Sequence, residues 1–157
     1  MRKEHKRAIK KFSWLFFIIY LIMMAYFLFF SEYLNRSNLG TEYRYNLTLF
    51  QEVKRSFWCF RAGDYSYFVL NFIMNILAFV PYGFFLPILS KNPKHRKFFY
   101  VIFSALQFTF LIEVVQLVLK VGTFDVDDIF LNTLGGVAGF ILFQIVQLIW
   151  KMIRKVL

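Results

Sequence analysis

The chain alternates between four long apolar runs and short polar segments, and this pattern predicts a protein that crosses a membrane. The runs span residues 12–30, 67–89, 98–119 and 129–150. Each holds roughly 20 residues, which as a helix rising about 1.5 Å per residue spans the ~30 Å hydrocarbon core of a bilayer. We therefore predict an all-α integral membrane protein with four transmembrane helices, folded as a single domain over residues 1–157.

Composition supports this prediction and limits the possible partners. Of the 157 residues, 59% are hydrophobic and 22% aromatic, which is more apolar surface than a soluble domain of this length can bury. The net charge of +10 would suit a nucleic-acid partner. The Lys and Arg residues instead flank the apolar runs and form no single patch, so we expect no nucleic-acid partner. The single Cys59 excludes an internal disulfide and a cysteine metal cluster.

The same Lys and Arg residues predict how the helices are oriented. Thirteen of the 19 lie in segments 1–11, 91–97 and 151–157, which four helices place on one side of the membrane. The remaining six lie in segments 31–66 and 120–128, on the opposite side. Because basic residues collect in cytoplasmic segments, we expect both termini in the cytoplasm and segment 31–66 to form an extracytoplasmic loop.

This loop contains one amphipathic segment, TLFQEVKRSFWCF at residues 48–60. Thr48 followed three residues later by Gln51 is typical of a capping box and predicts a helix that starts here. Phe50 and Phe57 then share one helical face. Two placements are open for the amphipathic helix: it lies on the outer leaflet of the membrane, or it packs on the other helices.

Polar and helix-breaking residues interrupt the second apolar run, which contains NFIMNILAFVPYGFFLP. Asn71 and Asn75 lie one turn apart on one helical face. Proline removes a backbone hydrogen bond from a helix. Pro81 and Gly83 therefore predict a kink near residues 77–83.

The third run carries Glu113 and Gln116 on one helical face. An ionised carboxylate near the centre of a bilayer costs ~2.5–3.5 kcal/mol even on the lenient insertion scale. Glu113 therefore has two interpretations. It is a protonated or hydrogen-bonded side chain that holds helices together, or it is a functional group of the kind that intramembrane carboxylates usually are.

The fourth run begins FDVDDIFLNTLGGVAGF and carries a cluster of acids at its start. Acids at this position complement the helix dipole. The three acids are Asp125, Asp127 and Asp128. Capping explains one of them, and either Asp125 or Asp127 fits that role. Further along, Gly135 and Gly139 form a small-xxx-small pair that permits close approach of another helix.

The predicted topology places most of these polar residues at one depth, near the outer face of the membrane. Polar residues that serve only local structure would not be expected to share a depth. We therefore predict a polar site that opens outward between the second, third and fourth helices. Its predicted residues are Asn75, Glu113, Gln116, Asp125, Asp128 and Asn132, supported by Pro81, Gly83, Gly135 and Gly139.

Three motifs in this order, NILAFVPYGFFLP, IEVVQL and GTFDVDDIFLNTLGGVAG, resemble the VanZ family of bacterial membrane proteins. The segment NLTLF at residues 46–50 resembles a further element of that family. Leu49 and Gly122 depart from it, where members usually have Pro and often have Arg. The resemblance implies a multi-pass protein of the bacterial cell membrane, associated with tolerance of teicoplanin and related lipoglycopeptides.

Three functions are compatible with these residues. The first is binding or shielding of an envelope lipid component, such as a lipid-linked cell-wall precursor, or of the lipoglycopeptide itself. The second is an enzyme in which Glu113, Asp125 and Asp128 act on a lipid-linked or glycan head group. The third is a small transporter, which with four helices would need a homo-oligomer. No His or Ser nucleophile accompanies the acids, which favours binding, and we expect membrane lipids as partners and neither cofactor nor metal.

Overall fold

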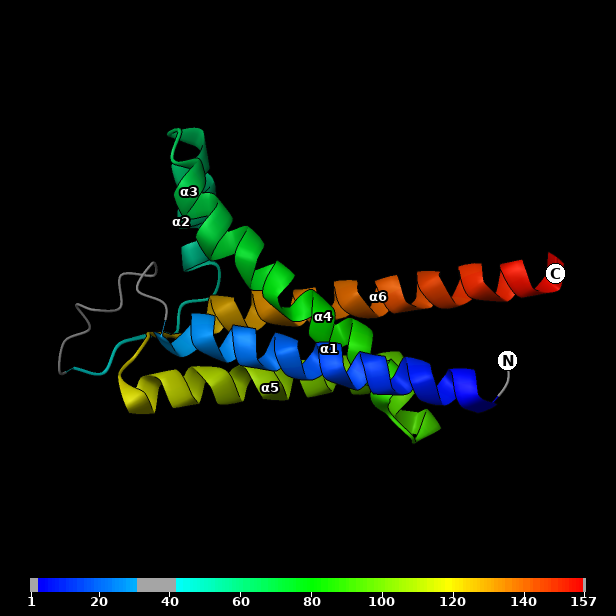
Figure 1. Ribbon diagram of the computed structural model, residues 1–157. Helices are drawn as coiled ribbons and strands as arrows, with labels where there is room; N and C mark the ends of the chain where they lie inside the picture. The colour runs from blue at the N-terminus through cyan, green and yellow to red at the C-terminus, as the bar shows by residue number, and fades with distance from the viewer. Residues whose placement is uncertain (1–2, 31–41, 157) are drawn as a thin grey trace.

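The protein is an elongated bundle of helices with a helical arm at one end (Figure 1). The computed structural model describes residues 3–30 and 42–156. The helices are α1 (Lys3–Phe30), α2 (Gln51–Arg61), α3 (Tyr65–Phe68), the π-helix η3 (Val69–Ile73), α4 (Met74–Leu89), the 3₁₀ helix η4 (Pro93–Arg96), α5 (Phe98–Leu119) and α6 (Val126–Val156). Two short strands, β1 (Tyr45–Asn46) and β2 (Phe124–Asp125), pair in parallel.

The all-α prediction with four membrane-spanning helices is confirmed. Within the residues that the structure describes, four helical segments are long and apolar enough to cross a membrane: Arg7–Leu28, Tyr65–Leu89, Phe98–Leu119 and Val126–Lys155. Both ends of the chain lie at the same end of the bundle, as an even number of crossings requires (Figure 1). Which end faces the cytoplasm stays a prediction from the charge distribution.

Helices α4 and α6 form the most closely packed pair of the bundle. Glycines line their contact, where a Cβ atom has no room. A Cβ at Gly135 would lie 2.0 Å from the carbonyl oxygen of Ile76, and one at Gly139 would lie 2.0 Å from that of Val80. Gly83 of α4 meets α6 in the same way, because its Cβ would lie 2.0 Å from the carbonyl oxygen of Gly136. The backbones of the two helices therefore touch directly.

The second membrane-spanning segment changes its geometry before its prolines. Helix α4 is continuous through Pro81 and Pro87. An irregular turn, the π-helix of residues 69–73, lies N-terminal to the predicted kink at 77–83, which stays a prediction. The long segment bends away from the bundle at its N-terminal end (Figure 1). Prolines mark a helix irregularity in the sequence, whereas π-helical turns carry no comparable residue signature.

We call residues 51–73, which comprise α2, α3 and η3, the arm. The arm stands out from the side of the bundle at the end opposite the termini (Figure 1). Aromatic side chains hold its two halves together: Phe57 packs on Phe72 with ring centroids 5.1 Å apart, and Phe60 packs on Phe68 at 5.0 Å. Of the two placements open for the amphipathic helix, packing on another helix is therefore observed, and that helix is the start of the second span.

Candidate functional site

The candidate site is a buried junction at the end of the bundle opposite the termini. Parallel pairing of β1 and β2 aligns Asn46 with Asp125. The end of α5 brings Glu113 to the same place, and the first turn of α6 adds Asp127. We call these four residues the polar junction. They come from parts of the chain that are far apart in sequence, so tertiary folding assembles the junction.

Asp125 lies at the centre of the polar junction. Its carboxylate accepts hydrogen bonds from the Asn46 side chain, at 3.2 Å to each oxygen, and from the backbone nitrogen of Asp127 at 2.8 Å. Burial raises the pKa of the Asp125 carboxyl above its usual range, and these hydrogen bonds counter that rise only in part. Because the Asp127 nitrogen belongs to the first turn of α6, Asp125 is the acid that caps this helix.

The side chain of Glu113 binds the main chain of Asp125. Its Oε2 accepts a hydrogen bond of 3.0 Å from the backbone nitrogen of Asp125, and its side chain is only 2% exposed. The structure therefore joins two of the predicted site residues, Glu113 and Asp125. The bond also satisfies a buried backbone donor, which would otherwise be costly in the membrane region.

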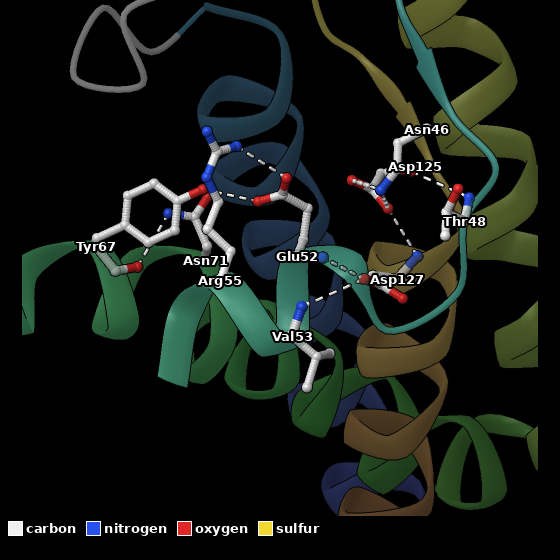
Figure 2. Close-up of polar contacts among 9 residues, drawn as sticks. All are labelled: Asn46, Thr48, Glu52, Val53, Arg55, Tyr67, Asn71, Asp125 and Asp127. Atoms are coloured by element: carbon white, nitrogen blue, oxygen red, sulfur yellow. Dashed lines mark hydrogen bonds and ion pairs between the residues drawn. The ribbon is translucent and has the colours of Figure 1, made fainter. Parts of the chain in front are cut away.

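Asp127 binds the start of α2 rather than its own helix (Figure 2). Its Oδ2 accepts hydrogen bonds from the backbone nitrogens of Glu52 at 2.7 Å and Val53 at 3.3 Å. Its Oδ1 accepts a further bond from the backbone nitrogen of Phe50. Phe50 adopts φ 65°, in the left-handed region that non-glycine residues seldom occupy, and this turn directs its nitrogen at Asp127. The side chain of Asp127 is fully buried.

This arrangement corrects the capping box predicted at Thr48. The residue that precedes α2 is Phe50, and it supplies no side-chain cap. The backbone nitrogen of Thr48 bonds the Oδ1 of Asn46 at 3.1 Å instead, as part of a local turn. Asp127 provides the missing acceptors from helix α6. The capping pattern therefore predicted the start of the helix closely but named the wrong acceptor.

A second polar contact joins the N-terminal half of the second span to α6. Asn75 donates its side-chain amide to Oδ1 of Asp128 and to the backbone oxygen of Asn71, the latter at 3.0 Å. Asn71 in turn donates to the backbone oxygen of Tyr67 at 3.0 Å. These side chains supply donors to carbonyl groups around the π-helix, where the regular helical bonding changes register.

The remaining predicted site residues bind elsewhere. Asn132 donates to the hydroxyl of Thr109 at 2.8 Å, which ties α6 to α5. Gln116 donates to the backbone oxygen of Leu28 at 3.1 Å, which ties α5 to α1. The six predicted residues thus divide among four places: the Glu113 and Asp125 contact, the Asn75 and Asp128 contact, the tie of Asn132 to Thr109 and the tie of Gln116 to Leu28.

The predicted site opens outward, whereas most of its predicted residues are buried in the structure. Glu113, Gln116, Asp125 and Asn132 are all buried, and each makes a hydrogen bond inside the chain. Carboxylates and amides in apolar surroundings are stable only when paired, and the structure pairs these residues with one another and with the backbone. Over residues 3–30 and 42–156, no group of three His, Cys, Asp or Glu side chains is placed to hold a metal ion.

Two parts of the site lie outside the set of residues predicted from the sequence. Asn46 and Asp127 belong to the junction; the motif NLTLF is the only signal for Asn46, and the sequence indicates Asp127 only as a possible cap of its own helix. On the arm, Glu52 accepts hydrogen bonds from Arg55 at 3.1 Å and from the Tyr67 hydroxyl at 2.7 Å (Figure 2). The spacing of Glu52 and Arg55 suits a helical ion pair, but no local pattern indicates the contact with Tyr67.

The fold and the junction define a multi-pass helical membrane protein whose polar residues tie a surface arm to the spanning helices. A protein-family model described as VanZ/LLP1 matches residues 17–147. The chain therefore belongs to the VanZ/LLP1 family, in agreement with the resemblance of its motifs. Neither the search of curated proteins nor that of solved structures found a match.

Proposed function

We propose that this protein acts at the outer face of the bacterial cell membrane, with both termini in the cytoplasm, and binds or shields a membrane-anchored envelope component there. The expected result is tolerance of lipid-tailed glycopeptide antibiotics such as teicoplanin. The occupant is the lipoglycopeptide or the lipid-linked cell-wall precursor that it targets. Family membership and the charge distribution support this proposal.

The observation that carries the proposal is the exposed aromatic surface of the arm. Trp58 is 70% exposed and Tyr65 is 61% exposed. Next to Tyr65, a shallow apolar groove of about 370 Å³ is lined by Ser66, Val69 and Leu70 together with that tyrosine. Trp and Tyr favour the membrane–water interface, where the lipid tail and peptide core of such an antibiotic also meet.

In this account the polar junction positions the arm and does not itself bind the ligand. Asp127 fixes the first turn of α2, and Asn75 and Asp128 hold the segment that follows the arm. The carboxylates of Glu113 and Asp125 accept hydrogen bonds within the chain. No contact of the described residues specifically favours the enzyme or transporter alternatives, so both stay predictions.

The test compares antibiotics with and without a lipid tail in a susceptible Gram-positive host. We expect expression of the protein to raise the inhibitory concentration of teicoplanin several-fold and to change that of vancomycin, which has no tail, much less. The double variant Trp58→Ala/Tyr65→Ala should lose the increase. Phe99→Ala is the matched control, because Phe99 is 81% exposed but lies on α5, away from the arm.

Two outcomes would contradict the proposal. Equal increases for both antibiotics would exclude a role for the lipid tail. Full activity of the double variant, at the same membrane level as the wild-type protein, would exclude the arm as the binding surface.

A further inference from the structure

One face of α2 combines two cations with Trp58, the single tryptophan of the arm. Lys54, Trp58 and Arg61 follow one another at intervals of four and three residues, so they form a single stripe along the helix. All three side chains are exposed, and Trp58 is 70% exposed. We call these three residues the basic stripe.

The basic stripe points away from the packed side of α2. The opposite side of the helix contains Ser56, which is 1% exposed, and Phe60, which packs on Phe68. The helix is also fixed about its axis, because Asp127 holds its first turn through the backbone nitrogens of Glu52 and Val53. The direction in which the basic stripe faces is therefore set by the fold.

The charges of the basic stripe are not used within the described part of the chain. In residues 3–30 and 42–156, the side chains of Lys54 and Arg61 make no hydrogen bond or ion pair. Arg55 on the same helix provides the contrast, because it pairs with Glu52 at 3.1 Å and lies 5.8 Å from the ring centroid of Tyr67. One cation of α2 therefore has a structural role, and two are left facing outward.

We propose that the basic stripe binds the phosphate head group of an anionic membrane lipid. In this proposal Trp58 occupies the membrane–water interface that tryptophan favours, and the flexible stems of Lys54 and Arg61 extend their charges to the phosphate on either side of it. This inference deepens the proposed function, on which it rests for the interfacial position of the arm. It adds a chemical class of partner, an anionic phospholipid, that would hold the arm against the leaflet.

The experiment uses Trp58 as its own reporter of lipid contact. The chain has three tryptophans, and replacing Trp14 and Trp150 by Phe leaves only Trp58. The full chain is reconstituted in nanodiscs of phosphatidylcholine that contain brominated phosphatidylglycerol or brominated phosphatidylcholine at equal content. Bromine quenches tryptophan fluorescence on contact, so the ratio of the two quenching levels reports head-group preference.

We expect stronger quenching by the anionic lipid, and a loss of this preference in Lys54→Gln/Arg61→Gln. Each cation removed should lower the apparent affinity for phosphatidylglycerol about fivefold. Two controls should keep the preference: Arg55→Gln, which removes the engaged cation, and Lys91→Gln/Lys94→Gln, which removes two cations at the other end of the bundle.

Equal quenching by the two lipids, or an unchanged preference in Lys54→Gln/Arg61→Gln, would overturn the inference. A loss of preference in the Lys91→Gln/Lys94→Gln control would also overturn it, because net charge rather than the basic stripe would then be responsible. The assay needs neither antibiotic nor cell sidedness. It can therefore fail while the tolerance assay succeeds, and the reverse also holds.

Discussion

The carboxylate of Asp127 on α6 accepts a hydrogen bond of 2.7 Å from the backbone nitrogen of Glu52 on α2, 75 residues earlier in the chain. A side chain of one spanning helix thereby caps α2, the first helix of the arm. The orientation of the arm relative to the bundle depends on this contact, because the first turn of a helix otherwise leaves its backbone donors unsatisfied.

Removing this cap should loosen the arm selectively. Asp127→Ala leaves the partly buried backbone donors of Phe50, Glu52 and Val53 without their acceptor, and we expect a loss of about 2 kcal/mol in stability. Hydrogen exchange of the Glu52 and Val53 amides should become faster, whereas exchange in α5 should stay unchanged. Thr48→Ala, at the capping position that the sequence pattern predicts, is the control and should have little effect. If both variants behaved alike, Asp127 would not be the cap.

Hydropathy was sufficient to predict the four spans, because roughly 20 apolar residues have only one stable arrangement in a bilayer. It also placed Glu113 and Asp125 at one depth, and the structure joins them. The cap by Asp127 was not predictable in this way. It depends on the pairing of Asn46 with Asp125, which brings together segments 79 residues apart, and local patterns carry no information about such pairing. The bend at residues 69–73 was missed for a related reason, since no residue type marks a π-helix.

Substituting Glu113 should separate membrane insertion from folding. In Glu113→Gln the side-chain oxygen can still accept from the Asp125 nitrogen, so we expect a folded and inserted protein. Glu113→Leu should insert at least as well as the wild type, because it removes a carboxylate from the membrane. Its free energy of unfolding should nevertheless fall by about 1–3 kcal/mol, because a buried backbone donor loses its partner. The variant should therefore unfold at a lower temperature. Membrane yield and thermal unfolding in detergent measure the two effects, and equal stability of the Leu and Gln variants would refute the role of this bond.

The contact between α4 and α6 should tolerate no side chain at its glycines. Gly139→Ala places a methyl group 2.0 Å from the carbonyl oxygen of Val80, and separating the helices should cost about 1–3 kcal/mol. Ala138→Leu, one residue away on an exposed face, should leave the melting temperature unchanged. The two variants are compared by thermal unfolding in the same detergent. Equal tolerance of both would show that the helices are not in direct backbone contact.

The polar junction should become more stable as the pH falls. Burial raises the pKa of Asp125 in the folded protein, so the folded state binds a proton more readily than the unfolded chain. The contribution of Asp125 to the free energy of unfolding is fully present below its unfolded-state pKa of about 4. It is lost as the pH rises through the raised pKa of the folded state. Between pH 7 and pH 4 the melting temperature of the wild type should therefore rise relative to that of Asp125→Asn. A constant difference between the two proteins would contradict this prediction.

The central claim is that the arm and the polar junction face the outside of the cell, and cysteine labelling tests it most directly. In a Cys59→Ser background, a single cysteine is introduced at Ala62 on the tip of the arm or at Lys94 in η4, both exposed positions. Protoplasts are then treated with a membrane-impermeant maleimide, before and after lysis. We predict that Ala62→Cys is labelled in intact protoplasts and Lys94→Cys only after lysis. Labelling of Lys94→Cys in intact protoplasts, with Ala62→Cys protected until lysis, would place the arm in the cytoplasm and contradict the account.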